Sequence, residues 1–301
     1  MGKSEMALRI AESLRGEIIS ADSMQVYAGM DIGTAKPSRA DRQRVPHHLL
    51  DVVTPGDSFN AADYTETAEK AIAGILEREN LPCVVGGTGL YVHALVDGFL
   101  FPQEGRDSDI RQELETRFAE EPEAVFAELK TVDPAAAERI HPNDARRIVR
   151  ALEVYRVMGE PISRLQKKKA LEESTYCPFF VGLNRERTEL YERINRRVDT
   201  MFSAGLVDEV RRLRTLYPKQ PTALQALGYK EVWDALEGRW SWEEAVDAVK
   251  KRTRRYAKRQ LSWFRRDGRI RWFDLSQQDY ATVTSTVIEA IQAARGGSTS
   301  A

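Results

Sequence analysis

The sequence predicts an α/β protein in which a parallel sheet is flanked by helices and interrupted by a helical insertion. In the first third of the chain, short apolar segments alternate with longer segments of helical periodicity, which is typical of parallel strands joined by helices. From about Asp107 to Glu173 strand signals nearly vanish, and patterns rich in Glu, Arg and Ala follow one another. We therefore predict a discontinuous core, residues 1–110 and 176–301, and a helical insertion domain, residues 111–175.

The first part of the core is predicted to form a helix and then a strand. Apolar residues recur at helical spacing behind Ser4 as far as Leu14, which indicates a helix. The short segment 17–20, with Ile18 and Ile19 at its centre, predicts a strand that delivers Asp22 at its carboxyl end, where ligands bind in open parallel sheets. A loop rich in Gly and Pro is predicted over 24–46.

The other core elements are also predicted from local patterns. An apolar run predicts a strand at 49–53. The helical spacing over 61–79 predicts a helix with Asn60 at its N-cap. The segment 82–85 predicts a buried strand that ends in a glycine-rich turn, and a strand at 179–183 is predicted to return to the core sheet. Helices are expected for the remainder of the chain.

Composition excludes some classes of protein. The chain has 301 residues, with 45 Lys and Arg against 46 Asp and Glu, so its net charge of −1 argues against a surface devoted to nucleic acid or membrane. Any site for a polyanion must be local. The two cysteines lack metal-type spacing, and the chain shows no signal sequence or membrane-spanning apolar run. We expect a cytoplasmic monomer with no membrane partner.

The residues Gly2, Lys3 and Ser4 match the end of the phosphate-binding P-loop pattern GxxxxGK[ST]. In that loop the lysine binds phosphate oxygens, the hydroxyl holds Mg²⁺, and amides at the helix start cradle the anion. The match predicts a P-loop NTPase-like core, with Mg²⁺ as cofactor at Ser4. A chance match is the alternative for so short a pattern. The first strand and the front of the P-loop are absent from this sequence, so we expect a degenerate or truncated loop.

Two side chains at predicted strand ends are candidate catalytic residues. Asp22 offers a carboxylate that can accept a proton from a nucleophile or hold a magnesium-bound water. Thr88 lies in the turn Gly86–Tyr91, where its hydroxyl and the neighbouring amides can bind an anionic leaving group. The alternatives are a turn or capping aspartate and a simple glycine turn.

Positive charge is concentrated in one C-terminal segment. Residues 250–266 contain nine Lys and Arg and no Asp or Glu. An apolar face around Ala257 can pack on the core, while a basic face around Arg255 and Lys258 can bind phosphates. A solvated helix face is the alternative. A second basic group is formed by Arg146, Arg147 and Arg150.

Taken together, these motifs resemble the tRNA dimethylallyltransferases from Gly2 to about Phe273. The most specific part is the run Ser20–Tyr27 followed by Gly29–Pro37. Other matching segments are Pro46–Asp51, Gly86–Tyr91, His141–Asp144 with Arg147, Arg193, Arg197, Asp199, Met201, Gly205–Val207, Leu227–Lys230, Ala257–Gln260 and Trp263.

The resemblance implies transfer of a dimethylallyl group from dimethylallyl diphosphate to the exocyclic amine of the adenosine 3′-adjacent to the tRNA anticodon. Asp22 matches the candidate base of the family, and Thr88 would assist catalysis. The residues implied to bind the diphosphate are Gly2, Lys3, Ser4 and Arg197. Because its P-loop is incomplete, we expect this form to bind tRNA but to turn over slowly.

The resemblance also implies which residues hold the anticodon stem-loop, whose target base must leave its stack to be modified. They are Asp22, Ser23, Met24, Gln25, Arg111, Arg146, Arg147, Ile148, Val149, Arg150, Gln225, Ala226, Leu227, Gly228, Tyr229, Lys230, Arg254, Arg255, Lys258 and Arg259. A small-molecule P-loop kinase remains an alternative, although it leaves the basic segment unexplained. A catalytically inactive tRNA-binding protein and an enzyme that prenylates free adenine nucleotides are the others.

Overall fold

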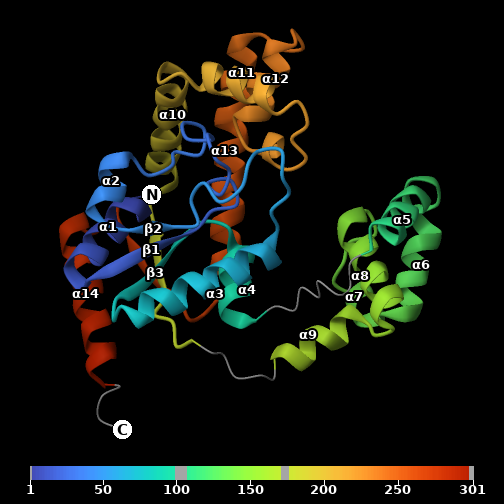
Figure 1. Ribbon diagram of the computed structural model, residues 1–301, viewed down its shortest axis with the longest axis horizontal. Helices are drawn as coiled ribbons and strands as arrows, with labels where there is room; N and C mark the ends of the chain where they lie inside the picture. The colour runs from blue at the N-terminus through green and yellow to red at the C-terminus, as the bar shows by residue number, and fades with distance from the viewer. Residues whose placement is uncertain (1, 99–106, 171–175, 298–301) are drawn as a thin grey trace. The chain divides into compact units, whose positions relative to one another are not determined.

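The protein divides into two compact units (Figure 1). The computed structural model describes residues 2–98, 107–170 and 176–297. One of the two units, here called the core unit, comprises Met1–Val92 and Pro178–Ala301. The other, here called the helical unit, comprises His93–Cys177. The helical unit thus begins earlier in the chain than the insertion predicted from 111 onward.

A three-stranded parallel sheet lies at the centre of the core unit. Its spatial order is β2-β1-β3, with β1 at Gly16–Ala21, β2 at His47–His48 and β3 at Leu81–Gly86. Every residue of the central strand β1 is buried. Ala21 is in register with Gly86, so β1 and β3 end at the same edge of the sheet. The predicted parallel sheet is therefore present, and it places the segments after Ala21 and Gly86 side by side.

The segment 49–53, predicted as a strand, is irregular, and that prediction was wrong. The second strand, β2, is only two residues long and precedes this segment. Leu49 and Asp51 have φ angles of 61° and 57°, in the left-handed region that interrupts an extended chain. The turned backbone presents the carboxylate of Asp51 to Lys36, whose Nζ donates to Asp51 Oδ1 at 2.6 Å. A tertiary ion pair thus overrides the local apolar pattern.

A short helix, α2 (Arg39–Arg44), lies within the segment predicted to be a loop. The backbone amide of Asp41 donates to Ser38 Oγ, and the Asp41 carboxylate accepts from the amide of Ser38. This reciprocal capping box stabilises the first turn. Six residues are too few to show apolar periodicity, so the capping pair was its only local signal.

Most of the core unit is helical. The predicted helices behind Ser4 and over 61–79 are confirmed as α1 (Lys3–Leu14) and α3 (Ala61–Glu77), the latter capped by Asn60. The other helices with residues in this unit are α4 (Gly89–Asp97), α10 (Arg187–Ser203), α11 (Leu206–Leu216), the 3₁₀ turn η1 (Ala223–Gln225), α12 (Tyr229–Leu236), α13 (Trp242–Phe264) and α14 (Tyr280–Gly297). Helix α13 packs against α10 and α12 (Figure 1).

A second parallel sheet contains the strands β4 (Val181–Asn184) and β5 (Arg271–Asp274). The predicted strand near 179–183 is thus present, but it pairs with β5 rather than with β1–β3. Strand β5 was missed because only Phe273 of its four residues is buried, which leaves no alternating pattern. Helix α1 packs on both sheets, as one stripe around Ile10 meets β4, β5 and α14 and another around Ala7 meets β1.

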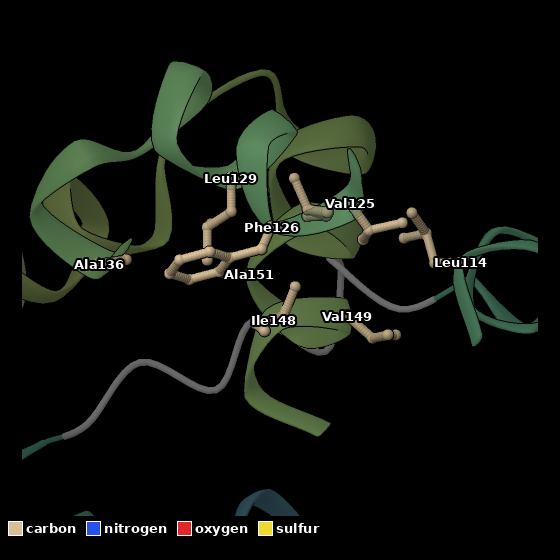
Figure 2. Packing of buried hydrophobic residues seen from close by; sticks show 9 residues of the cluster. Leu114, Val125, Phe126, Leu129, Ala136, Ile148, Val149 and Ala151 are labelled. Atoms are coloured by element: carbon tan, nitrogen blue, oxygen red, sulfur yellow. The ribbon is translucent and has the colours of Figure 1, made fainter. Parts of the chain in front are cut away.

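The helical unit packs five helices around one apolar cluster. They are α5 (Ser108–Glu120), α6 (Pro122–Val132), α7 (Pro134–Ala137), α8 (Ala145–Met158) and α9 (Ile162–Ala170). Figure 2 shows that side chains of α5, α6, α7 and α8 supply the buried cluster, with Phe126 and Leu129 of α6 among them. No strand occurs among the described residues of this unit, as the sequence predicted. None of the helices in the described parts of the chain is long and apolar enough to cross a bilayer.

A buried carboxylate joins the strands of the larger sheet to the end of α3. Glu17 on β1 is 3% exposed and accepts hydrogen bonds from Arg78 Nε and Nη2 at 2.9 and 2.8 Å, from Asn80 Nδ2 at 2.8 Å and from His48 Nε2 at 2.6 Å. The Arg78 guanidinium is the main reason that the pKa of Glu17 falls from 4.5 to about 2, and burial opposes the change.

We expect this carboxylate to make stability depend on pH. Between pH 4.5 and about 2 an unfolded chain protonates Glu17 while the folded chain does not, so the contribution is present above pH 5 and is lost as the pH falls toward 2. The shift corresponds to about 3 kcal/mol. Urea unfolding of Glu17→Gln should show a deficit of this order at pH 7 that shrinks near pH 3. Glu66→Gln, which removes an exposed ion pair with Lys70, is the control, and a deficit for Glu17→Gln that does not change with pH would contradict the assignment.

Candidate functional site

The two candidate catalytic residues lie on adjacent strand ends of the larger sheet. The amide of Thr88 donates to the carbonyl of Ala21 at 3.1 Å, and the amide of Ser23 donates to Thr88 Oγ1 at 3.1 Å. The amide of Met24 donates to Asp22 Oδ1 at 2.9 Å, which turns the chain away from the sheet. The structure therefore brings Asp22 and Thr88 together at the edge where the sequence analysis expected a ligand.

Two cations lie close enough to Asp22 to interact with its charge. Lys3, at the start of α1, donates from Nζ to the carbonyl of Gly86 at 3.0 Å. Arg197, from α10, approaches the carbonyl of Thr34 at 3.4 Å. Burial lowers the pKa of both side chains and the Asp22 carboxylate raises it, while the Arg197 charge lowers that of Lys3 further. Two cations and one carboxylate leave one excess positive charge at this edge of the sheet, which an incoming anion would neutralise.

The glycines of the turn after β3 are required by close contacts. A Cβ on Gly86 would lie 2.0 Å from the carbonyl oxygen of Ala21. A Cβ on Gly87 would lie 2.0 Å from Gln260 Nε2 and 3.1 Å from Lys3 Nζ. The turn is therefore more than a simple reversal of the chain, because Lys3 and Gln260 both rest on its backbone.

Sequence reasoning missed two polar residues of α13 that face this turn. Gln260 Nε2 donates to the carbonyl of Gly87 at 2.8 Å. The hydroxyl of Tyr256 lies near the side chains of Gln260 and Thr88, and burial together with the charge of Asp22 raises its pKa. The available signal was their spacing of four residues on α13, which places them on one helix face within the basic segment.

Glu209 of α11, also missed, holds the loop that carries Thr34. It is 5% exposed, and its carboxylate accepts from the amides of Asp31, Ile32 and Gly33 at 3.0, 2.9 and 3.3 Å. The hydroxyl of Tyr229 donates to the same carboxylate at 2.6 Å. The carbonyl of Thr34 in turn accepts from Arg197, so Glu209 positions the cation indirectly. Gly33 and Glu209 are more than 150 residues apart in the chain, so no local sequence pattern predicts this contact.

The predicted RNA-contact residues of the core unit fall into two groups. Exposed members are Gln225, Lys230, Arg255, Lys258 and Arg259. Half-buried or buried members are Asp22, Ser23, Met24, Gln25, Ala226, Leu227, Gly228, Tyr229 and Arg254, and several of them make internal contacts. Gln25 Nε2, for example, donates to the carbonyl of Thr34 at 3.2 Å, and Arg254 Nη1 donates to Asn195 Oδ1 at 2.6 Å.

Part of the charge on the basic segment is paired with carboxylates of neighbouring helices. Lys250 Nζ lies 2.6 Å from Asp199 Oδ1, and Arg252 Nη1 lies 2.7 Å from Glu231 Oε1, a carboxylate that is 1% exposed. The exposed basic face of α13 is thus centred on Arg255. The buried Ala257 and the exposed Arg255 and Lys258 follow the two faces predicted from the sequence, whereas Arg254, predicted to contact RNA, is half-buried.

The remaining predicted RNA-contact residues belong to the helical unit. Arg111 Nη2 and Arg150 Nη1 lie 2.6 and 2.9 Å from one oxygen of the buried Glu153. Two guanidiniums on one carboxylate retain a net positive charge. Arg146 and Arg147 are at the start of α8, whereas the side chains of Ile148 and Val149 lie in the apolar cluster of Figure 2 and anchor that helix.

The motif residues at the chain start occupy the N-terminus of α1. Gly2 is the N-cap with φ 89°, and its carbonyl accepts from the amide of Met6 at 3.1 Å. Ser4 is exposed on the first turn. In the described residues, no group of three or more His, Cys, Asp or Glu is placed to hold a metal ion.

The fold and this cluster define a parallel α/β protein with a cationic site at the carboxyl edge of its sheet. A model of the IPP transferase family matches residues 25–267, and the chain belongs to this family. It is 45% identical to the tRNA dimethylallyltransferase of Halothermothrix orenii, over 95% of this chain and 88% of that protein. The resemblance inferred from the sequence is therefore confirmed.

Two solved structures are similar over most of the chain. The full-length tRNA isopentenylpyrophosphate transferase of Bacillus halodurans is 42% identical, with a TM-score of 0.73 over 97% of this chain and 92% of that one. A eukaryotic dimethylallyltransferase, described as acting on tRNA, is 29% identical, with a TM-score of 0.80 over 91% of this chain and 71% of that one. The α/β architecture with its small parallel sheet is thus shared with tRNA prenyltransferases.

Proposed function

We propose that this protein transfers a dimethylallyl group from dimethylallyl diphosphate to the exocyclic amine of the adenosine 3′-adjacent to the anticodon of tRNA. The observation that carries the proposal is the cluster of Lys3, Asp22 and Arg197 at the carboxyl edge of the sheet. It combines a carboxylate with two cations, as an amine acceptor and a diphosphate leaving group require. The family and its members named for tRNA support the choice of acceptor.

The chemistry assigns a role to each member of the cluster. The exocyclic amine is a poor nucleophile because its lone pair is delocalised into the ring, so a carboxylate that accepts its proton assists attack. The new C–N bond forms as the C–O bond to the diphosphate breaks, and the proton passes to Asp22. Lys3 and Arg197 stabilise the charge that develops on the departing diphosphate, and the hydroxyl of Thr88 lies beside them.

Mg²⁺ fits this site through the diphosphate rather than through a protein cage. Mg²⁺ prefers oxygen ligands and is commonly held by one or two protein groups together with substrate phosphates. The exposed hydroxyl of Ser4 on the first turn of α1 is the group that would hold it. When bound, the ion would neutralise charge on the diphosphate.

A label-transfer experiment tests the function. The protein is incubated with labelled dimethylallyl diphosphate and unmodified tRNA, and separately with labelled ATP and candidate metabolites. We expect label in RNA from the prenyl donor alone. Label passing from ATP to a small molecule would favour a kinase, and preferential prenylation of AMP would assign the protein to enzymes that act on free nucleotides. Size-exclusion chromatography and cell fractionation check the proposed monomer and its cytoplasmic location.

The exposed basic face of α13 gives a prediction about RNA binding. We expect Arg255→Ala to weaken binding of tRNA and to reduce the slope of log K against log salt concentration by about 1, because one phosphate contact is lost. The turnover number at saturating tRNA should change less than twofold. Filter binding over a salt series measures both quantities.

A surface lysine on the same unit provides the control. Lys70→Ala removes one exposed positive charge from α3, so it changes the net charge of the protein equally. Its salt slope should equal that of the wild type. Equal slopes for all three proteins would argue against the α13 face as the RNA-binding surface.

A further inference from the structure

The exposed side of α13, together with Arg266 just beyond its end, lines an open surface cavity that overlaps the proposed RNA-binding face. The cavity measures about 490 Å³ and is lined by Arg255, Lys258, Arg259, Ser262, Trp263 and Arg266. Four of these six side chains carry positive charge. The cavity is also lined by Trp263. Its side chain is 38% exposed, although large aromatic side chains are usually well buried. The cavity therefore combines a partly exposed indole with four cations.

Contacts with the turn after β3 seat Trp263 beside the candidate catalytic residues. A Cβ on Gly89 would lie 2.4 Å from Cδ1 and Nε1 of the indole, so the ring rests directly on the glycine backbone. Gly89 follows Thr88 in the chain. One helical turn before Trp263, Gln260 donates to the carbonyl of Gly87. The aromatic surface is thus held next to the site at which the target adenosine would react.

A nucleotide is the ligand that matches both features of the cavity. Its base stacks on an aromatic ring, while its phosphates pair with Lys and Arg. A purely apolar ligand would not need four cations, and a free phosphate would not need an exposed indole. When the target adenosine leaves the anticodon loop, the base next to it loses a stacking partner. An exposed aromatic ring beside the target pocket can replace that partner.

We propose that Trp263 stacks on the base of a nucleotide adjacent to the target adenosine, and that the surrounding cations bind its phosphates. This subsite rests on the proposed function and extends it, because it names a contact to RNA outside the modified nucleotide. Trp263 acts here as a binding residue, so its loss should raise the KM for RNA and leave the turnover number at saturating RNA nearly unchanged.

The test uses the full chain and anticodon stem-loops with 2-aminopurine on the 5′ or 3′ side of the target. With wild-type protein and with Trp263→Phe, we expect binding to quench the fluorescence at one of these positions. With Trp263→Ala the quenching should disappear, and the RNA should bind about tenfold more weakly. Trp242→Ala, at the other end of α13 where the indole is also exposed, is the control and should behave as wild type.

A second experiment compares wild type and Trp263→Ala on RNA in which the nucleotide next to the target lacks its base. If Trp263 stacks on the neighbouring base, RNA that lacks this base should bind wild type and Trp263→Ala equally. An unchanged tenfold difference on abasic RNA, or quenching that survives in Trp263→Ala, would overturn the subsite. Wild-type protein that binds the stem-loop and transfers the prenyl group without any quenching would also overturn it and leave the proposed function intact. Failure of wild type to bind or modify the stem-loop would refute the proposed function itself.

Discussion

Asp22→Asn is expected to lower the turnover number by about 10²- to 10⁴-fold, the usual contribution of a general base. The asparagine keeps a side-chain oxygen that accepts from the amide of Met24, so the turn after β1 should persist. It removes the negative charge that raises the pKa of Lys3 and Arg197. The site then carries more net positive charge. The KM for dimethylallyl diphosphate should therefore fall or stay constant while turnover falls, which a loss of folding would not produce.

Steady-state kinetics with the prenyl donor and direct measurement of tRNA affinity separate these effects. Asp208→Asn, at an exposed position on α11, is the matched control and should retain wild-type kinetics. We expect the affinity of Asp22→Asn for tRNA to stay within twofold of wild type. A parallel loss of RNA affinity and turnover would count against a role as base.

Lys3→Gln is expected to reduce kcat/KM for the prenyl donor by about 10²- to 10³-fold, as is typical when a group that stabilises a leaving anion is removed. Glutamine retains a side-chain N–H donor directed toward the carbonyl of Gly86, although its side chain is one bond shorter than that of lysine. What is lost is the charge beside the diphosphate. Affinity for tRNA should not change, since the basic face of α13 remains intact.

A second substitution at this position tests whether charge alone is sufficient. Lys3 Nζ is held at 3.0 Å from the carbonyl of Gly86, and even a Cβ on Gly87 would lie only 3.1 Å from it, so there is little room for a larger head group. Lys3→Arg should therefore recover less than a tenth of the lost activity, because a guanidinium cannot occupy the place of the ammonium. Lys70→Gln is the surface control. Full recovery by arginine would show that the site requires only a nearby positive charge.

Local patterns were sufficient for the elements whose residues form their own periodic signal. Helix α3 was predicted because its apolar stripe and the cap at Asn60 are contiguous in sequence. The strand end at Asp22 and the turn at Thr88 were predicted for the same reason. In a parallel sheet, carboxyl ends of neighbouring strands share one edge, and the register of Ala21 with Gly86 brings the two sites together.

Local patterns failed where a distant side chain determined the backbone. The segment 49–53 has a strand-like composition, but the pairing of Asp51 with Lys36 accompanies a left-handed backbone there. Strand β5 is held by pairing with β4, from which it is separated by most of the C-terminal helices. Ile148 lies among basic residues in sequence, yet the packing of α8 directs it into the core of the helical unit.

The sequence by itself determined the family, the parallel sheet, the basic face of α13 and the residue types at the candidate site. These depend on contiguous motifs and on the regular geometry of helices and strands. Only the tertiary structure decided which side chains surround them. Glu209 accepts a hydrogen bond from the amide of Asp31, far from it in the chain. In the same way, Gln260 and Trp263 contact Gly87 and Gly89. Such contacts arise from the packing of whole helices, which no local spacing encodes.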